Sequence, residues 1–151
     1  MQEHNIKPDF TSQIAEILAK YVSSERVVVK KEKKIDVVTL CDDESLKIEI
    51  SDEDLILWLF SCEFYELRGN DEEVLETVDY QLELIFTNPI TTVKTYKANK
   101  LIKAEYKINE EYYGTEYMHW FWALTHFGEK REETTIINYD PIGGRFTEII
   151  Q

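Results

Sequence analysis

The feature that most constrains this fold is an aromatic stretch in the last third of the chain, residues 116–127, with the sequence EYMHWFWALTHF. In a β-strand, successive side chains point to opposite faces. Here both faces would then be apolar and aromatic, which is typical of a strand that is covered on both sides. The sequence therefore predicts a buried strand at 116–127, and the rest of the chain has to supply its cover.

Length and composition predict one globular domain spanning residues 1–151. Hydrophobic residues make up 43% of the 151 positions, which argues against disorder, and only five glycines and three prolines are present, so no linker is expected. The N-terminus lacks a basic segment followed by an apolar one, and the longest apolar run is 55–60. These features predict a protein of the cytoplasm, with no membrane partner.

The first half of the chain reads as one helix followed by short strands. Apolar residues at helical spacing predict a helix over 10–22. Strands are expected at 26–30 and 35–41, paired as a hairpin across the charged turn 31–34, and again at 46–50. The lysines around the first hairpin are typical of an edge strand that must resist aggregation.

Residues 55–67 allow two interpretations. Ser51 with Asp54 three positions later resembles a capping box that starts a helix. The dense run of large apolar residues at 56–60, followed by Phe64 and Tyr65, favours a strand instead. We favour the strand and leave the helix open.

A second helix is predicted over 70–88. Asn70 is a good N-cap, the first turn is acidic as the helix dipole prefers, and Asn88-Pro89 ends the helix. After it the period changes to two. Strands are expected at 91–98, 101–109, 116–127 and 134–139, with a turn at 140–144 and a short edge strand at 146–150.

The first two of these strands are predicted to form a hairpin closed by Asn99-Lys100, with Val93 opposite Tyr106 and Thr95 opposite Ala104. The segment 109–114 is expected to turn into the aromatic strand. The predicted fold class is α+β: a mostly antiparallel sheet with two helices packed on it and a C-terminal strand meander.

No sequence motif indicates catalysis, a cofactor or a metal. His119 and His126 would face opposite sides of a strand, and the only other histidine is His4. Cys41 and Cys62 lack the spacing of a redox or metal motif and are expected to be buried free thiols. We therefore expect no enzyme activity, no cofactor and no metal site.

Negative charge is concentrated in the middle of the chain. Residues 42–83 hold fifteen acidic and two basic residues, which equals the whole net charge of −13. Nucleic acid is an unsuitable partner for such a segment, and a basic protein is a suitable one. The predicted docking surface combines an acidic turn with the polar face of the second helix. Its residues are Asp52, Glu53, Asp54, Glu72, Glu76, Asp79 and Glu83.

The order of elements, the acidic helix 70–88 and the hairpin KTYKANKLIK at 94–103 together resemble small bacterial immunity proteins of polymorphic toxin systems. The resemblance covers the second half of the chain and transfers no individual residue. It implies a single, non-enzymatic α+β domain that binds and blocks a cognate toxin. The alternatives are an interaction module that needs no basic partner, and a ligand-binding or enzymatic domain with a pocket against the aromatic strand, lined by Tyr117, His119 and Phe121.

Overall fold

The computed structural model describes residues 9–60, 62–118 and 128–150. These residues form two α-helices and ten β-strands, with a short 3-10 helix between α1 and β1. The elements are α1 (Phe10–Leu18), the 3-10 helix (Ser24–Arg26), β1 (Val27–Lys31), β2 (Asp36–Leu40), β3 (Asp43–Ile50), β4 (Leu55–Leu59), β5 (Cys62–Leu67), α2 (Asp71–Thr87), β6 (Ile90–Lys97), β7 (Lys100–Ile108), β8 (Glu111–Tyr117), β9 (Lys130–Asp140) and β10 (Arg145–Ile150).

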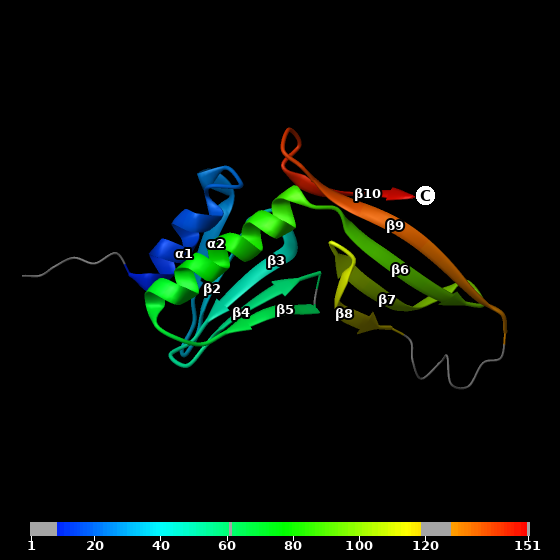
Figure 1. Cartoon of the computed structure of the whole chain (residues 1–151), viewed down its shortest axis with the longest axis horizontal. Helices are drawn as coiled ribbons and strands as arrows, with labels where there is room; N and C mark the ends of the chain where they lie inside the picture. The colour runs from blue at the N-terminus through cyan, green and yellow to red at the C-terminus, as the bar shows by residue number, and fades with distance from the viewer. Residues whose placement is uncertain (1–8, 61, 119–127, 151) are drawn as a thin grey trace, which may run out of the picture.

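The strands form two antiparallel five-stranded sheets. The first sheet has the order β1-β2-β3-β4-β5, and the second has the order β10-β9-β6-β7-β8. Both helices pack on one face of the first sheet, and α2 leads directly into β6 of the second sheet (Figure 1). The predicted α+β class is confirmed.

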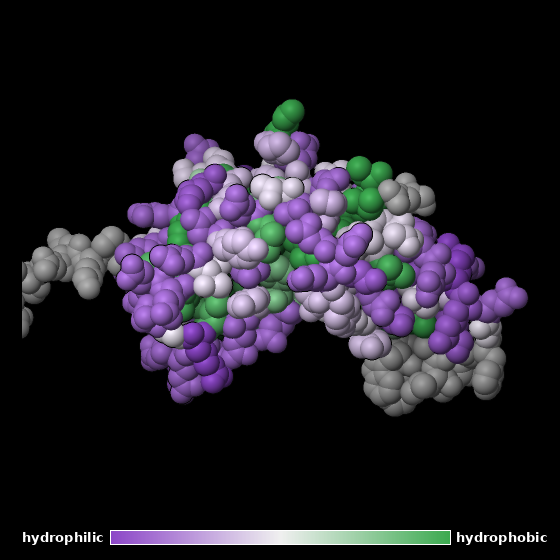
Figure 2. Space-filling view, in the orientation of Figure 1, coloured by the Kyte–Doolittle hydropathy of each residue, from purple (hydrophilic) through white to green (hydrophobic). Residues whose placement is uncertain are grey.

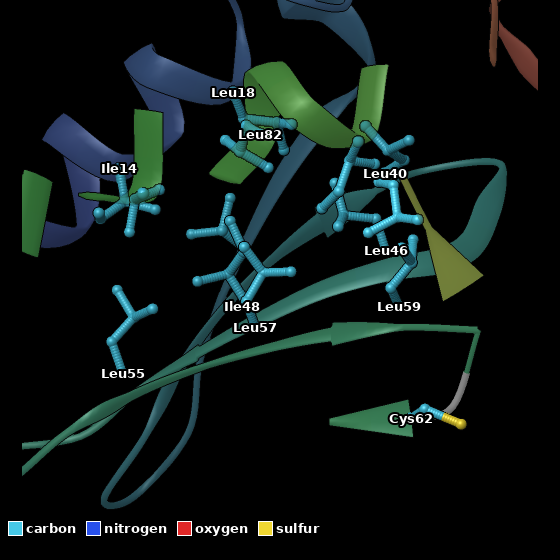
Figure 3. Close-up of a cluster of buried hydrophobic side chains, with 14 of the residues drawn as sticks. Ile14, Leu18, Leu40, Leu46, Ile48, Leu55, Leu57, Leu59, Cys62 and Leu82 are labelled. Carbon is cyan, nitrogen blue, oxygen red and sulfur yellow. The ribbon is translucent and has the colours of Figure 1, made fainter. Parts of the chain in front are cut away.

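The main core lies between the helices and the first sheet. Alternation in β3 and β4 sends Ile48 and Leu57 to the helix side, where they are paired across the strands and fully buried. Ile14 and Leu18 of α1 and Leu82 of α2 pack on this layer from the helix side (Figure 3). Ile14 and Leu18 are four residues apart, which places both side chains on one face of α1.

Helix α2 begins and ends as its sequence predicts. The Asn70 side chain accepts a hydrogen bond from the Glu73 backbone N–H at 2.9 Å, which satisfies one of the donors left over at the helix start. Three acidic residues fill the first turn, and the helix stops at Thr87 before Asn88-Pro89.

Aromatic rings and one glycine join the two sheets. Phe60, in the β4–β5 turn, stacks on Tyr106 of β7 with 5.6 Å between ring centroids and meets Phe146 of β10 edge-on at 5.4 Å. Gly114 of β8 lies against Cys62 of β5, so closely that a β-carbon there would come within 2.7 Å of the Cys62 β-carbon. One continuous hydrophobic cluster therefore includes residues of both sheets.

Three predicted boundaries are wrong. The segment 55–67 is extended, which confirms the favoured interpretation over the helix. It forms two strands and not one, because the chain reverses at Phe60, whose φ is 51°. Helix α1 ends at Leu18 rather than at 22, since the chain then turns to bring Tyr21 to α2. The predicted turn 109–114 is confined to Asn109 and Glu110, both at positive φ, and β8 begins at Glu111.

The predicted hairpin register is off by one residue. Tyr106 lies opposite Thr92, and Ala104 lies opposite Lys94. Two features produce this register. The turn is formed by Ala98 and Asn99, both in the left-handed region, rather than by Asn99-Lys100, and this alone would shift the pairing by two residues. An irregularity between Thr95 and Tyr96 restores one residue, so the net shift is one. A shift of one residue exchanges the two faces of a strand.

The predicted C-terminal meander is present in β6, β7 and β8, which follow one another in the second sheet, and the order departs from it at β9. β9 pairs with β6 instead of following β8, so β8 and β10 form opposite edges of the second sheet. The predicted strand 116–127 is described only at its start, where Glu116 and Tyr117 complete β8, and residues 119–127 lie outside the described part of the chain.

Candidate protein-binding surface

A hollow of about 450 Å³ lies at the end of the first sheet where the β3–β4 turn meets the start of α2. Its charged lining is predominantly acidic, with seven carboxylates and three basic side chains. The acidic residues are Asp9, Glu32, Asp36, Asp52, Glu53, Asp54 and Asp71, and the basic residues are Lys33, Lys34 and Arg68. We call this feature the acidic hollow.

The β3–β4 turn is held by Ser51. The Ser51 hydroxyl accepts the backbone N–H groups of Glu53 at 3.3 Å and Asp54 at 3.2 Å, and donates to the Asp54 carboxylate at 2.8 Å. This Ser-centred turn fixes the backbone and turns Asp54 inward. Asp52 and Glu53 are left exposed at the rim of the acidic hollow.

The polar face of α2 continues this acidic rim. Glu72, Glu76 and Glu83 are exposed, and no ion pair joins any of them to another described residue. Their spacing of four and seven residues places them on one stripe of the helix. Asp71, at the first position of α2, lines the acidic hollow and connects it to this stripe.

Asp79 does not belong to the exposed stripe. Its carboxylate accepts hydrogen bonds from the Lys20 ammonium and the Tyr21 hydroxyl, which come from the chain after α1. The hydrogen bond from Lys20, and then that from Tyr21, hold the pKa of Asp79 below its ordinary value. Asp79 therefore ties α2 to the segment after α1 and has no unpaired charge to offer a partner.

Other acids of the middle segment are also compensated. Asp42 forms ion pairs with Arg26 at 2.9 Å and Arg145 at 3.5 Å, and Glu49 pairs with Lys47 at 3.0 Å. Arg68 lies 3.9 Å from Asp54 and 3.0 Å from Glu66. Within residues 42–83, most carboxylates that have no ion pair in the described part of the chain therefore lie at the β3–β4 turn and along α2, and Glu44 and Glu63 are exposed acids outside these elements.

Of the seven predicted docking residues, the structure leaves five exposed and turns two inward. Asp54 and Asp79 have protein partners, and Asp71 joins the surface although the prediction left it out. The acidic first turn of α2 was a signal that could have included it. We call Asp52, Glu53, Asp71, Glu72, Glu76 and Glu83 the acidic surface.

The ion pair of Asp79 predicts a pH-dependent contribution to stability. A carboxylate whose pKa falls on folding stabilises the native state above its unfolded pKa of about 4 and loses this contribution as the pH drops through the folded pKa. Asp79→Asn should therefore be less stable than the parent near neutral pH, by up to about 1 kcal/mol, and this difference should shrink as the pH falls further below about 4. Urea unfolding of both proteins over a series of pH values measures the difference. Glu76→Gln removes a carboxylate of the same helix that has no ion pair, so its difference in free energy of unfolding from the parent should not change with pH in this way.

The described residues contain no other arrangement that suggests chemistry. No group of three or more histidine, cysteine or acidic side chains in the described ranges could hold a metal ion. Cys41 is exposed, contrary to expectation, and Cys62 is buried, which raises the pKa of its thiol, with a smaller effect from Glu116. The three histidines lie outside the described residues. None of the helices in the described ranges has the length and apolar character that crossing a membrane requires.

Comparison with known proteins finds no matching family model, no matching curated protein and no matching solved structure. The two five-stranded sheets and two helices define the architecture as α+β.

Proposed function

We propose that this chain is a non-enzymatic protein-binding domain, and specifically a cytoplasmic immunity protein that binds and blocks a cognate basic bacterial toxin. The observation that carries the proposal is the acidic surface, where unpaired carboxylates of the β3–β4 turn and α2 adjoin a hollow with seven acidic and three basic side chains. An acidic field of this kind attracts a basic protein from a distance and disfavours partners of other charge.

The acidic hollow suits long cationic side chains. Lysine and arginine can bury their aliphatic stems against the apolar lining residues Leu55, Leu67 and Val74 while their charged ends meet the rim carboxylates. A toxin that binds phosphate-containing substrates would offer such side chains in its own cleft. Occupying that cleft with carboxylates would block the toxin without any chemical step.

We expect the reading frame directly upstream of the gene to encode the cognate toxin, and its product is the test partner. Its C-terminal domain should arrest growth when expressed alone in a bacterial host, and coexpression of this protein should restore growth. Calorimetric titration of the two purified proteins should show an affinity that falls at least about tenfold when the salt concentration rises from about 50 to 200 mM. Failure to restore growth, or an affinity that does not respond to salt, would contradict the proposal.

A further inference from the structure

The four sheet edges of the protein are protected to different degrees. β1 carries the exposed lysines Lys30 and Lys31, which oppose pairing with another strand. β5 and β8, the inner edges of the two sheets, contact each other, and Gly114 packs on Cys62 there. The remaining edge is β10.

β10 lacks several of the usual protections of an edge strand, although it is short and carries the charged residues Arg145 and Glu148. Its sequence, RFTEII, contains no lysine and no proline, and its pairing with β9 is regular along its length. Glu148 is already paired with Lys94 at 2.5 Å. Ile149 is 53% exposed, and Figure 2 shows hydrophobic side chains at the surface where β10 lies. Among the described residues no strand occupies the outer side of β10. Such an edge is a template for a further strand.

We propose that β10 pairs antiparallel with β10 of a second copy of this chain, which joins the two second sheets across a two-fold axis. The inference is independent of the proposed function. A two-fold axis perpendicular to the sheet places the same face of both copies on the same side. Odd- and even-numbered residues of β10 point to opposite faces, so two residues that lie opposite each other across the axis must both be odd-numbered or both be even-numbered. Centring the pair on Glu148 would set like charges opposite each other, which is unfavourable.

The register centred on Thr147 avoids this repulsion and pairs residues 145–149. Thr147 then meets its own copy, a favourable cross-strand combination, and Arg145 lies opposite Ile149 of the second copy. The aliphatic part of Arg145 would cover the exposed Ile149 side chain. In the monomer β10 lies away from the β3–β4 turn (Figure 1), so both acidic hollows of the dimer remain accessible.

The net charge determines how this dimer responds to salt. Each copy carries a net charge of −13, so the two repel each other, and added salt screens that repulsion. The contact is small for a protein interface, so it is expected to be weak. Dimerisation should therefore strengthen as salt rises, which is the opposite of the salt response expected for binding a basic toxin.

The test is sedimentation velocity of the full chain over about 10–500 μM at about 50 and 500 mM salt. The parent protein should dimerise, more strongly at the higher salt concentration. Thr147→Lys places two ammonium groups opposite each other at the axis and should abolish the dimer. Asn138→Lys is the matched control. Asn138 is exposed and lies opposite Thr147 on β9, inside the sheet, and its replacement adds the same single positive charge as Thr147→Lys. Asn138→Lys should leave the dimer intact.

Cross-linking supplies a second measurement that does not depend on the stability of one variant. In a Cys41→Ser background, Thr147→Cys should form an intermolecular disulfide on mild oxidation, because cross-strand partners lie within disulfide reach, and Asn138→Cys should not. A parent protein that stays monomeric throughout, a dimer that survives Thr147→Lys, or equal cross-linking at positions 147 and 138 would each overturn the proposal.

Discussion

Replacing Leu57 with alanine is expected to lower the free energy of unfolding by about 2–5 kcal/mol, which is a large part of the stability of a protein this size. Leu57 is fully buried in β4, the fourth strand of the first sheet, paired with Ile48 and lying beneath Leu82 of α2 (Figure 3). The truncation removes apolar contacts and leaves a cavity, because the side chains above it come from helices that are held by other contacts. Chemical denaturation followed by circular dichroism measures the loss.

Ile56→Ala is the matched control for this prediction. Ile56 precedes Leu57 in the same strand, but its side chain points away from the helices and is only half-buried. Truncation of Ile56 should lower the free energy of unfolding by about 1 kcal/mol. Equal losses at the two positions would mean that the helices do not cover the face of the first sheet that bears Leu57.

Reversing both rim carboxylates of the β3–β4 turn, Asp52→Lys with Glu53→Lys, should weaken binding of the cognate toxin on the order of 50-fold, about 2–3 kcal/mol. Both side chains are exposed at the rim of the acidic hollow. The turn itself is held by Ser51 and Asp54, so the fold should tolerate the change. Calorimetric titration of the upstream toxin domain measures the affinity, and the growth assay measures protection.

A control with the same change in net charge separates the local surface from the overall field. Glu25→Lys with Glu129→Lys changes two exposed acids outside the lining of the acidic hollow, neither of which has an ion pair within the described residues. This variant should lose only the part of the affinity that depends on long-range attraction, about threefold. If both double variants bind equally well, the partner does not contact the acidic hollow.

The local elements could be predicted because their causes are local. Asn70, the acidic first turn and Asn88-Pro89 determine where α2 begins and ends, and all of these signals lie within or next to the helix. The same holds for β1 and β2, whose short β-branched sequences and charged turn predicted the hairpin and its edge lysines. The acidic turn at 51–54 was recognised for the same reason.

Errors appeared wherever one backbone conformation redirected the chain. Ala98 and Asn99 both adopt left-handed conformations, and this turn together with the irregularity between Thr95 and Tyr96 shifts the β6–β7 register by one residue from the predicted one, which exchanges its faces. Phe60 adopts a positive φ although it is a large aromatic residue, and so divides one predicted strand into two. Packing of the Phe60 ring against Tyr106 and Phe146 favours this conformation, and neither partner is close to it in sequence.

The α+β class, the helix α2 and the acidic character of residues 42–83 could be predicted from local signals, because periodicity, caps and charge are properties of neighbouring residues. Contacts between distant parts of the chain determine that β9 pairs with β6 and that Asp79 is neutralised by Lys20. The same contacts determine which carboxylates remain at the surface, since strand pairing and neutralisation join residues that are far apart in the chain.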